Sequence, residues 1–111
     1  MIHEMRLHDA PFKLIQAGTK TIELRLFDEK RQQIQVGDEI VFKNRVTEEE
    51  LSTKVIAMHI YSSFADLYRD YDKVSLGYGK DEEAKPEDME LYYSKEEQEK
   101  YGVVGIEIEL L

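Results

Sequence analysis

Four side chains that could take part in chemistry lie close together within residues 18–26. They are the ammonium of Lys20, the hydroxyl of Thr21, the carboxylate of Glu23 and the guanidinium of Arg25. Polar and apolar residues alternate after Lys20, which predicts a strand with one face in a core and the other presenting donors and acceptors. Lys20 itself falls on the apolar face, so its ammonium either reaches past the end of the core or points into a cavity. The simpler alternative is a surface strand with an ordinary Glu/Arg pair.

These side chains fit two kinds of chemistry. Desolvation at the strand end would favour the neutral amine of Lys20, which can act as a base or a nucleophile, whereas the carboxylate of Glu23 would keep it charged. In the other case, Thr21, Glu23 and Arg25 read a base edge or a ribose, with Arg25 or Arg31 on a phosphate. The first interpretation makes Lys20 and Glu23 catalytic, and the second makes the group a ligand-binding site.

Tyrosines are numerous in the second half of the chain, which holds all seven. Most occur at helical spacing and are expected in a core with their hydroxyls near the surface. Tyr78 and Tyr93 are the two whose rings we expect to be available for stacking on a nucleobase.

No metal or cofactor site is predicted. The chain has no cysteine, and His3, His8 and His59 lack the spacing of zinc ligands. The Gly77-x-Gly79 pair lacks the third glycine, the preceding strand and the following helix of a dinucleotide-binding loop, so it indicates a turn. No serine, histidine and acid are arranged as in a hydrolase triad.

Charge is distributed unevenly along the chain, whose net charge is −9. Residues 1–45 hold eight Lys/Arg and seven Asp/Glu, a net charge of +1, and residues 46–111 hold seven and seventeen, a net charge of −10. An anionic ligand therefore fits the N-terminal half. The acidic half disfavours long duplex nucleic acid as a partner.

The length and the patterns predict one α+β domain over residues 1–111, built as a small mixed β-barrel of five to six strands flanked by short helices. No apolar run is long enough for a membrane span and the N-terminus has no signal character, so a cytoplasmic location is expected. Strands are predicted at residues 2–7, 20–26, 39–43, 51–61 and 103–111, and helices at residues 10–17, 63–71, 86–93 and 94–101.

Some details of this prediction are specific enough to be tested. Asp9 is expected to cap the first helix. The strand at residues 51–61 is expected at the centre of the sheet, with Ile56, Met58 and Ile60 on one face. Leu110 is expected to point inward, and residues 72–85 are expected to form a long exposed loop.

Three segments resemble a known family. They are GxKTIExR at 18–25, VGDxIxF at 36–42 and YGVVGIEI at 101–108. Together they look like the ASCH domain, a relative of the PUA RNA-binding fold, and the resemblance covers essentially the whole chain. It implies a β-barrel with a cleft beside the Gly-x-Lys-Thr strand, accepting RNA or a nucleotide-like ligand. Lys20, Thr21, Glu23 and Arg25 would line this cleft, with Arg31 at its rim and Tyr78 as a stacking residue.

The resemblance also implies an alternative activity. Some small proteins of the family that this chain resembles are amidohydrolases, which remove the acetyl group from N4-acetylcytidine. The lysine of those enzymes falls at Lys20. Their catalytic threonine falls at Glu23, and their glutamate lies after the fourth strand, where Glu82, Glu83 and Glu90 are candidates. The sequence thus favours an RNA- or nucleotide-binding module, with an amidohydrolase as the alternative. A third hypothesis is a protein-interaction domain that uses the acidic residues 81–99.

Overall fold

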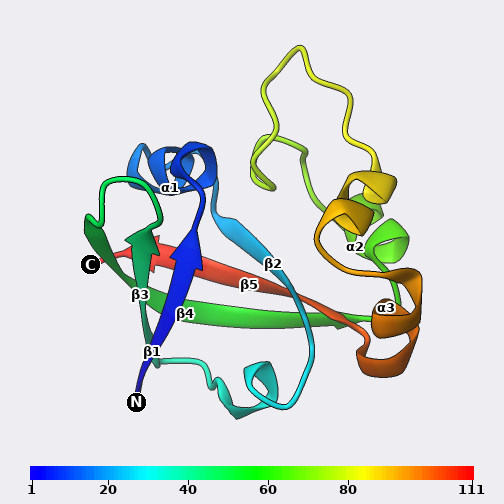
Figure 1. The fold of residues 1–111 in the computed structure, drawn as a ribbon, viewed down its shortest axis with the longest axis horizontal. Helices are drawn as coiled ribbons and strands as arrows, with labels where there is room; N and C mark the ends of the chain where they lie inside the picture. Colours follow the sequence, from blue (N-terminus) through cyan, green and yellow to red (C-terminus); the bar gives the residue numbers. More distant parts are fainter.

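The computed structural model describes residues 1–111. Its strands and helices follow one another in the predicted order (Figure 1). They are β1 (Ile2–Leu7), α1 (Asp9–Gln16), β2 (Ile22–Leu26), the 3-10 helix η1 (Arg31–Gln33), β3 (Glu39–Asn44), β4 (Glu50–Tyr61), α2 (Phe64–Asp70), the 3-10 helix η2 (Pro86–Leu91), α3 (Lys95–Tyr101) and β5 (Val103–Leu110). None of these helices has both the length and the apolar character needed to cross a bilayer.

All five strands form one mixed sheet in the order β1-β3-β4-β5-β2, with β4 at its centre as predicted. β1 and β3 are parallel and the other neighbours are antiparallel. The sheet curls strongly into a half-barrel, and its two edge strands approach one another. Nη2 of Arg25 on β2 donates a hydrogen bond to the carbonyl oxygen of Arg6 on β1 at 3.1 Å. The predicted α+β barrel with flanking helices is therefore confirmed, with an opening between β1 and β2.

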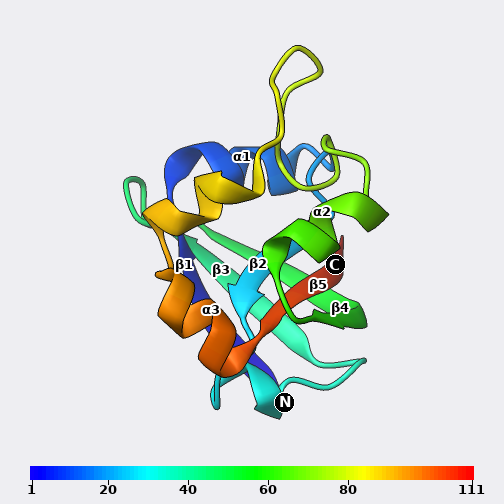
Figure 2. The same cartoon turned by 90° about the vertical axis from the view of Figure 1, so that its right-hand side faces the viewer.

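Helices cover both faces of the curled sheet. Phe12 and Ile15 of α1 pack into the inner core with residues of β1, β3, β4 and β5. Phe64 and Leu67 of α2 pack into a second core against the apolar residues of β2. Figure 2 shows α2 and α3 in front of β2 and β5, with α1 at the upper end of the sheet. Because α2 takes the apolar side of β2, the polar side of β2 is turned toward the inside of the half-barrel.

Most of the helix caps predicted from the sequence are present in the structure. The Ser63 hydroxyl accepts a hydrogen bond from the backbone N–H of Asp66, and Ser94 and Glu97 form the predicted capping box of α3. Gly102 ends α3 with a φ of 71°. The expected cap at Asp9 is wrong, because His8 precedes the first helical residue and Asp9 lies inside the first turn. There the Asp9 carboxylate accepts a hydrogen bond from the Asn44 amide at 3.0 Å.

Two details of the predicted side-chain directions in the sheet are also wrong. A register shift between Val55 and Ala57 adds a residue to β4, so Val55 and Met58 face the inner core while Ile56 falls outside the pairing and is exposed. Ile60 stays on the Met58 face, opposite Val104, but it is exposed near the end of the strand. Strict alternation cannot reveal such a bulge. Leu110 is 44% exposed, because it lies at the end of β5 beyond the packed part of the sheet.

The segment at residues 72–85 is only partly the exposed loop that was predicted. Leu76 is 4% exposed and belongs to the second core. The carbonyl oxygen of Ser75 accepts hydrogen bonds from the backbone N–H groups of Thr21 at 3.0 Å and Ile22 at 3.1 Å. Residues 72–78 therefore pack along the start of β2, and the exposed residues of the segment are 72, 79–83 and 85.

Candidate functional site

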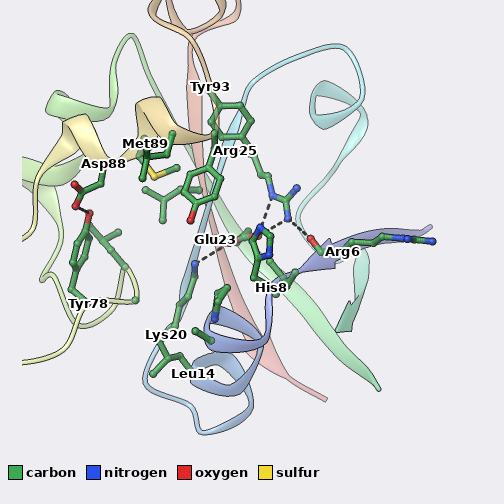
Figure 3. A pocket seen from close by; sticks show the side chains of 18 of the residues that line it. Arg6, His8, Leu14, Lys20, Glu23, Arg25, Tyr78, Asp88, Met89 and Tyr93 are labelled. Atoms are coloured by element: carbon green, nitrogen blue, oxygen red, sulfur yellow. Dashed lines mark hydrogen bonds and ion pairs between the residues drawn. The ribbon is translucent and has the colours of Figure 1, made fainter. Parts of the chain in front are cut away.

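Three charged side chains meet at the opening between β1 and β2. Glu23 is 3% exposed, and Lys20 and Arg25 approach its carboxylate from opposite sides (Figure 3). Lys20 Nζ lies 3.0 Å from Glu23 Oε1. Arg25 donates to Glu23 Oε2 from Nε at 3.0 Å and from Nη2 at 2.8 Å. We call this group the buried charge triad. The simpler alternative was a surface strand with a Glu/Arg pair: the pair is present, between Glu23 and Arg25, but its burial shows that the surface position is wrong.

Two neighbouring segments fix the Lys20 side chain. The backbone N–H of Lys20 donates to the carbonyl oxygen of Leu14 at 3.2 Å, so the end of α1 carries Lys20 into the opening. Its aliphatic chain then passes Gly77, where an added Cβ would lie 3.1 Å from Lys20 Cδ. Gly77 also has a φ of +107°, a backbone conformation that favours glycine. The position of the ammonium therefore depends on a glycine far away in the sequence.

Charges within the triad control its ionisation. Burial alone would raise the pKa of the Glu23 carboxyl, but the charges of Lys20 and Arg25 outweigh burial and hold that pKa below its ordinary value of 4.5. Burial would lower the pKa of Arg25, and the charge of Glu23 raises it instead. Two cations and one carboxylate leave the triad with an excess positive charge. Glu23 is the only partner of the Lys20 ammonium, which has three N–H donors, so the triad can bind a carbonyl oxygen or an anion through the remaining ones.

The triad lines a cavity of about 690 Å³ between α1, β2, the 72–78 segment and η2. This size lies within the range of small-molecule sites. Leu14, Leu24, Leu76 and Met89 supply apolar surface. Aromatic rings complete the wall, and they belong to His8, Tyr68, Tyr78, Tyr92 and Tyr93. The cavity thus combines apolar and aromatic walls with a few convergent charged groups.

Tyr78 and Asp88 lie on another side of the cavity from Arg25 (Figure 3). The Tyr78 hydroxyl makes hydrogen bonds of 2.9 Å to the Tyr68 hydroxyl and of 2.9 Å to Asp88 Oδ2. Burial, together with these two partners, raises the pKa of Tyr78 above its ordinary value. Its ring also meets the Tyr68 ring edge-on, at 5.9 Å between centroids. Tyr78 is therefore held in one orientation at the cavity wall.

The structure brings together five of the six residues proposed from the sequence. Lys20, Glu23, Arg25, Arg31 and Tyr78 all line the cavity. Thr21 does not line it, because this residue lies just before β2 and its backbone N–H and carbonyl are paired with Ser75 and Ile108.

Arg31 is one of the residues that line the cavity. Its Nη1 donates to Asp28 at 3.0 Å, whereas its Nε is buried without a hydrogen-bond partner. Of the three candidate glutamates after the fourth strand, Glu82 lines the cavity, and its carboxylate accepts a hydrogen bond from the Gly79 N–H at 2.7 Å. No cluster of three or more His, Asp or Glu side chains is placed to hold a metal ion.

Several wall residues were not predicted from the sequence. Arg6, His8 and Arg45 reach the cavity from the ends of β1 and β3, and Met89 and Tyr92 reach it from η2 and the residue after it. For Arg6 and Arg45 the only signal in the sequence was the slight positive charge of residues 1–45. Their positions follow from the parallel pairing of β1 with β3 and from the packing of η2, which local patterns do not reveal.

The family model described as the ASCH domain matches residues 5–111. The chain belongs to the ASCH domain family. Its resemblance to that family and its PUA-like fold are therefore confirmed. No functionally curated protein matches it.

Solved structures of ASCH-like proteins have the same fold. The crystal structure of hypothetical protein PH0355 is 36% identical, with a TM-score of 0.84 over 100% of both chains. The solution NMR structure of protein PF0455 from Pyrococcus furiosus is 36% identical, with a TM-score of 0.70 over 100% of this chain and 98% of that one. A mutant of ZmASCH from Zymomonas mobilis is 12% identical, with a TM-score of 0.61 over 96% of this ASCH chain and 66% of that one. This last likeness concerns the fold alone.

Proposed function

We propose that this ASCH domain binds RNA or a nucleotide, and that one nucleoside unit enters the cavity beside β2. The observation that carries the proposal is the buried charge triad, which lies in the wall of a cavity of about 690 Å³ with aromatic sides. ASCH domains are PUA-like and associated with RNA binding, which supports the same class of ligand.

The chemistry of a nucleobase matches these walls. Bases have apolar faces and an edge of carbonyl oxygens, ring nitrogens and N–H groups, and single-stranded nucleic acid exposes both. Lys20 and Arg25 would donate to a carbonyl oxygen, and Glu23, ionised by its two neighbours, would accept from an amino or imino N–H. Tyr78 and Tyr92 offer ring surface at the cavity wall. A nucleoside thus finds donors, an acceptor and stacking surface in one place.

Removing the Lys20 ammonium is expected to weaken this binding. Lys20→Met keeps an aliphatic chain beside Gly77 but deletes the charged donor. The loss of a charge-assisted hydrogen bond should cost about 1.5–3 kcal/mol, roughly a ten- to hundredfold loss of affinity. The four ribonucleosides and a single-stranded RNA hexanucleotide should be titrated by calorimetry into the wild type and the variant.

Lys13→Met is the matched control for this experiment. Lys13 is an exposed lysine of α1 whose only ion pair is with Asp9, and it does not line the cavity. It should bind as the wild type does. If no probe gives a heat of binding with the wild type, the proposed function is wrong. If the wild type and Lys20→Met bind with equal affinity, the triad does not take part in binding.

One contact favours a second candidate function, an amidohydrolase that acts on an N4-acetylcytidine-like nucleoside. Lys20 Nζ and Glu23 Oε1 lie 3.0 Å apart in the cavity wall, and Glu82 lines the same cavity. In this candidate Lys20 acts as base or nucleophile with Glu23 assisting. The low pKa of Glu23 and its pairing with Arg25 favour binding over proton transfer in the ligand-free protein, so we rank this candidate second.

Incubation with N4-acetylcytidine, followed by chromatography for cytidine, distinguishes the two candidates. If the protein is an amidohydrolase, cytidine should accumulate with the wild type and be absent with Lys20→Met. If it is a binding module alone, N4-acetylcytidine should remain intact even when the protein is concentrated enough to bind most of the nucleoside. Turnover that survives in Lys20→Met would exclude lysine as base or nucleophile.

A further inference from the structure

A second cavity, of about 490 Å³, adjoins the first on the outer side of β1 and β3. We call it the basic groove. Six cations line it against two carboxylates, Glu4 and Glu50, an excess of four positive charges. The cations are Arg6, Arg25, Lys30, Arg31, Lys43 and Arg45. A cationic groove of this kind is unexpected in a chain whose net charge is −9.

Most of these cations have no counter-ion within the protein. Arg25 is paired with Glu23 and Arg31 with Asp28, but Arg6, Lys30, Lys43 and Arg45 make no ion pair. The sheet register also sets Arg6 of β1 beside Lys43 of β3. Like charges on neighbouring strands destabilise a sheet. Glu50 of β4 faces Lys43 on its other side and offsets part of this repulsion, and a bound anion would relieve the rest.

The basic groove is continuous with the cavity that holds the triad. Arg6, Arg25, Arg31 and Arg45 line both spaces, so these four side chains form the boundary between them. The Arg6 side chain points away from the Lys20 side of the triad (Figure 3). Arg31 on this boundary carries the buried Nε that lacks a partner. An anion attached to a ligand in the first cavity would therefore enter the basic groove without leaving contact with the shared arginines.

We infer that the basic groove is a phosphate subsite, which holds the phosphate attached to the nucleoside bound beside β2. This inference rests on the proposed function and extends it, because it assigns the ligand class as a phosphorylated nucleotide, free or within a single strand, and excludes the bare nucleoside as the preferred ligand. Arginine suits this role because its planar guanidinium donates paired hydrogen bonds to phosphate oxygens, and lysine adds a mobile charge. Elsewhere the acidic surface repels further phosphates, so the charge pattern favours a short contact.

The test compares each ribonucleoside with its 5′- and 3′-monophosphates at low salt, by calorimetry, in the wild type and in Lys43→Met and Lys30→Met. Both lysines line the basic groove and not the first cavity. The better monophosphate should bind about tenfold or more tightly than its nucleoside in the wild type. Lys43→Met should lower that ratio severalfold. For a single-stranded RNA hexanucleotide, the slope of log K against log salt should fall by about 1 in Lys43→Met.

Lys54→Met is the matched control, because Lys54 is also a strand lysine with a glutamate as register neighbour, and it lines neither cavity. It should leave the ratio and the salt slope unchanged. Equal affinity for nucleoside and monophosphate, or a gain from phosphate that both groove variants retain, would overturn the phosphate subsite and leave the nucleoside site standing. No binding of any nucleoside or nucleotide would overturn the proposed function, and the phosphate subsite with it.

Discussion

Replacing Glu23 with glutamine is expected to lower the free energy of unfolding by about 3–5 kcal/mol. The change keeps the shape of the side chain but removes the only negative charge of the triad. The side chains of Lys20 and Arg25 are 9% and 14% exposed, so two cations would face each other with little water to solvate them. Urea unfolding followed by circular dichroism measures the loss.

The same variant should change the dependence of stability on acid. The pKa of Glu23 is lower in the folded protein than its ordinary value of 4.5, so the ion pairs stabilise the fold above that value. This stabilisation is lost as the pH falls below 4.5 and through the lowered pKa. Because glutamine cannot titrate, the difference in unfolding free energy between wild type and Glu23→Gln should be largest near neutral pH and shrink toward pH 3.

Two further variants make this expectation specific. Glu107→Gln removes a carboxylate that lies 3.0 Å from His59 but is 34% exposed, and such a pair should contribute no more than about 1 kcal/mol. Combining Lys20→Met with Glu23→Gln should cost less than the sum of the two single changes, by about 0.5–3 kcal/mol, since the partners are in contact. A Glu23→Gln loss as small as that of Glu107→Gln would contradict the view that the triad is a buried unit.

Substituting Gly77 with alanine is expected to be the second most damaging of these changes. The φ of +107° at Gly77 is costly for any residue with a Cβ, by about 1–3 kcal/mol. In addition the new Cβ would lie 3.1 Å from Cδ of Lys20, whose ammonium is held by Glu23. Either the 72–78 segment or the Lys20 side chain has to move. We therefore expect a loss of stability together with a loss of nucleoside affinity.

Gly37→Ala separates the two causes. Gly37 has a similar φ of +96°, and an added Cβ there meets no atom within 4 Å. Both variants should therefore show the backbone penalty in urea unfolding. Only Gly77→Ala should also weaken ligand binding, and its loss of stability should exceed that of Gly37→Ala. Identical behaviour of the two glycine variants would mean that Lys20 does not depend on the 72–78 segment.

Local patterns in the sequence predicted the elements and the central part of the site. Alternation at residues 21–26 predicted a polar strand face, and the position of Lys20 on the apolar side indicated a cation that could point into a cavity. The triad consists of that cation and two charged residues of the polar face. Capping residues such as Ser94 predicted helix ends, because a cap satisfies backbone groups a few residues away. These signals are short-range, so the sequence alone carries them.

What the sequence did not predict depends on contacts between distant residues. Gly77 looked like turn chemistry, and its contact with Lys20 exists only because Ser75 pairs with the start of β2. The neighbouring positions of Arg6 and Lys43 follow from the parallel register of β1 and β3, which no local spacing encodes. The bulge at Val55 likewise changes side-chain directions without changing the composition of the strand.

The hydrogen bond from Arg25 to the Arg6 carbonyl has a consequence for the behaviour of the protein in solution. β1 and β2 are the two edge strands of an unclosed sheet, and edges with free backbone groups can add a strand from another molecule. The guanidinium of Arg25 occupies one of those groups and ties the two edges together at 3.1 Å. A substitution of Arg25 that changed the ligand specificity would therefore also release the two edge strands and lower the resistance of the protein to aggregation.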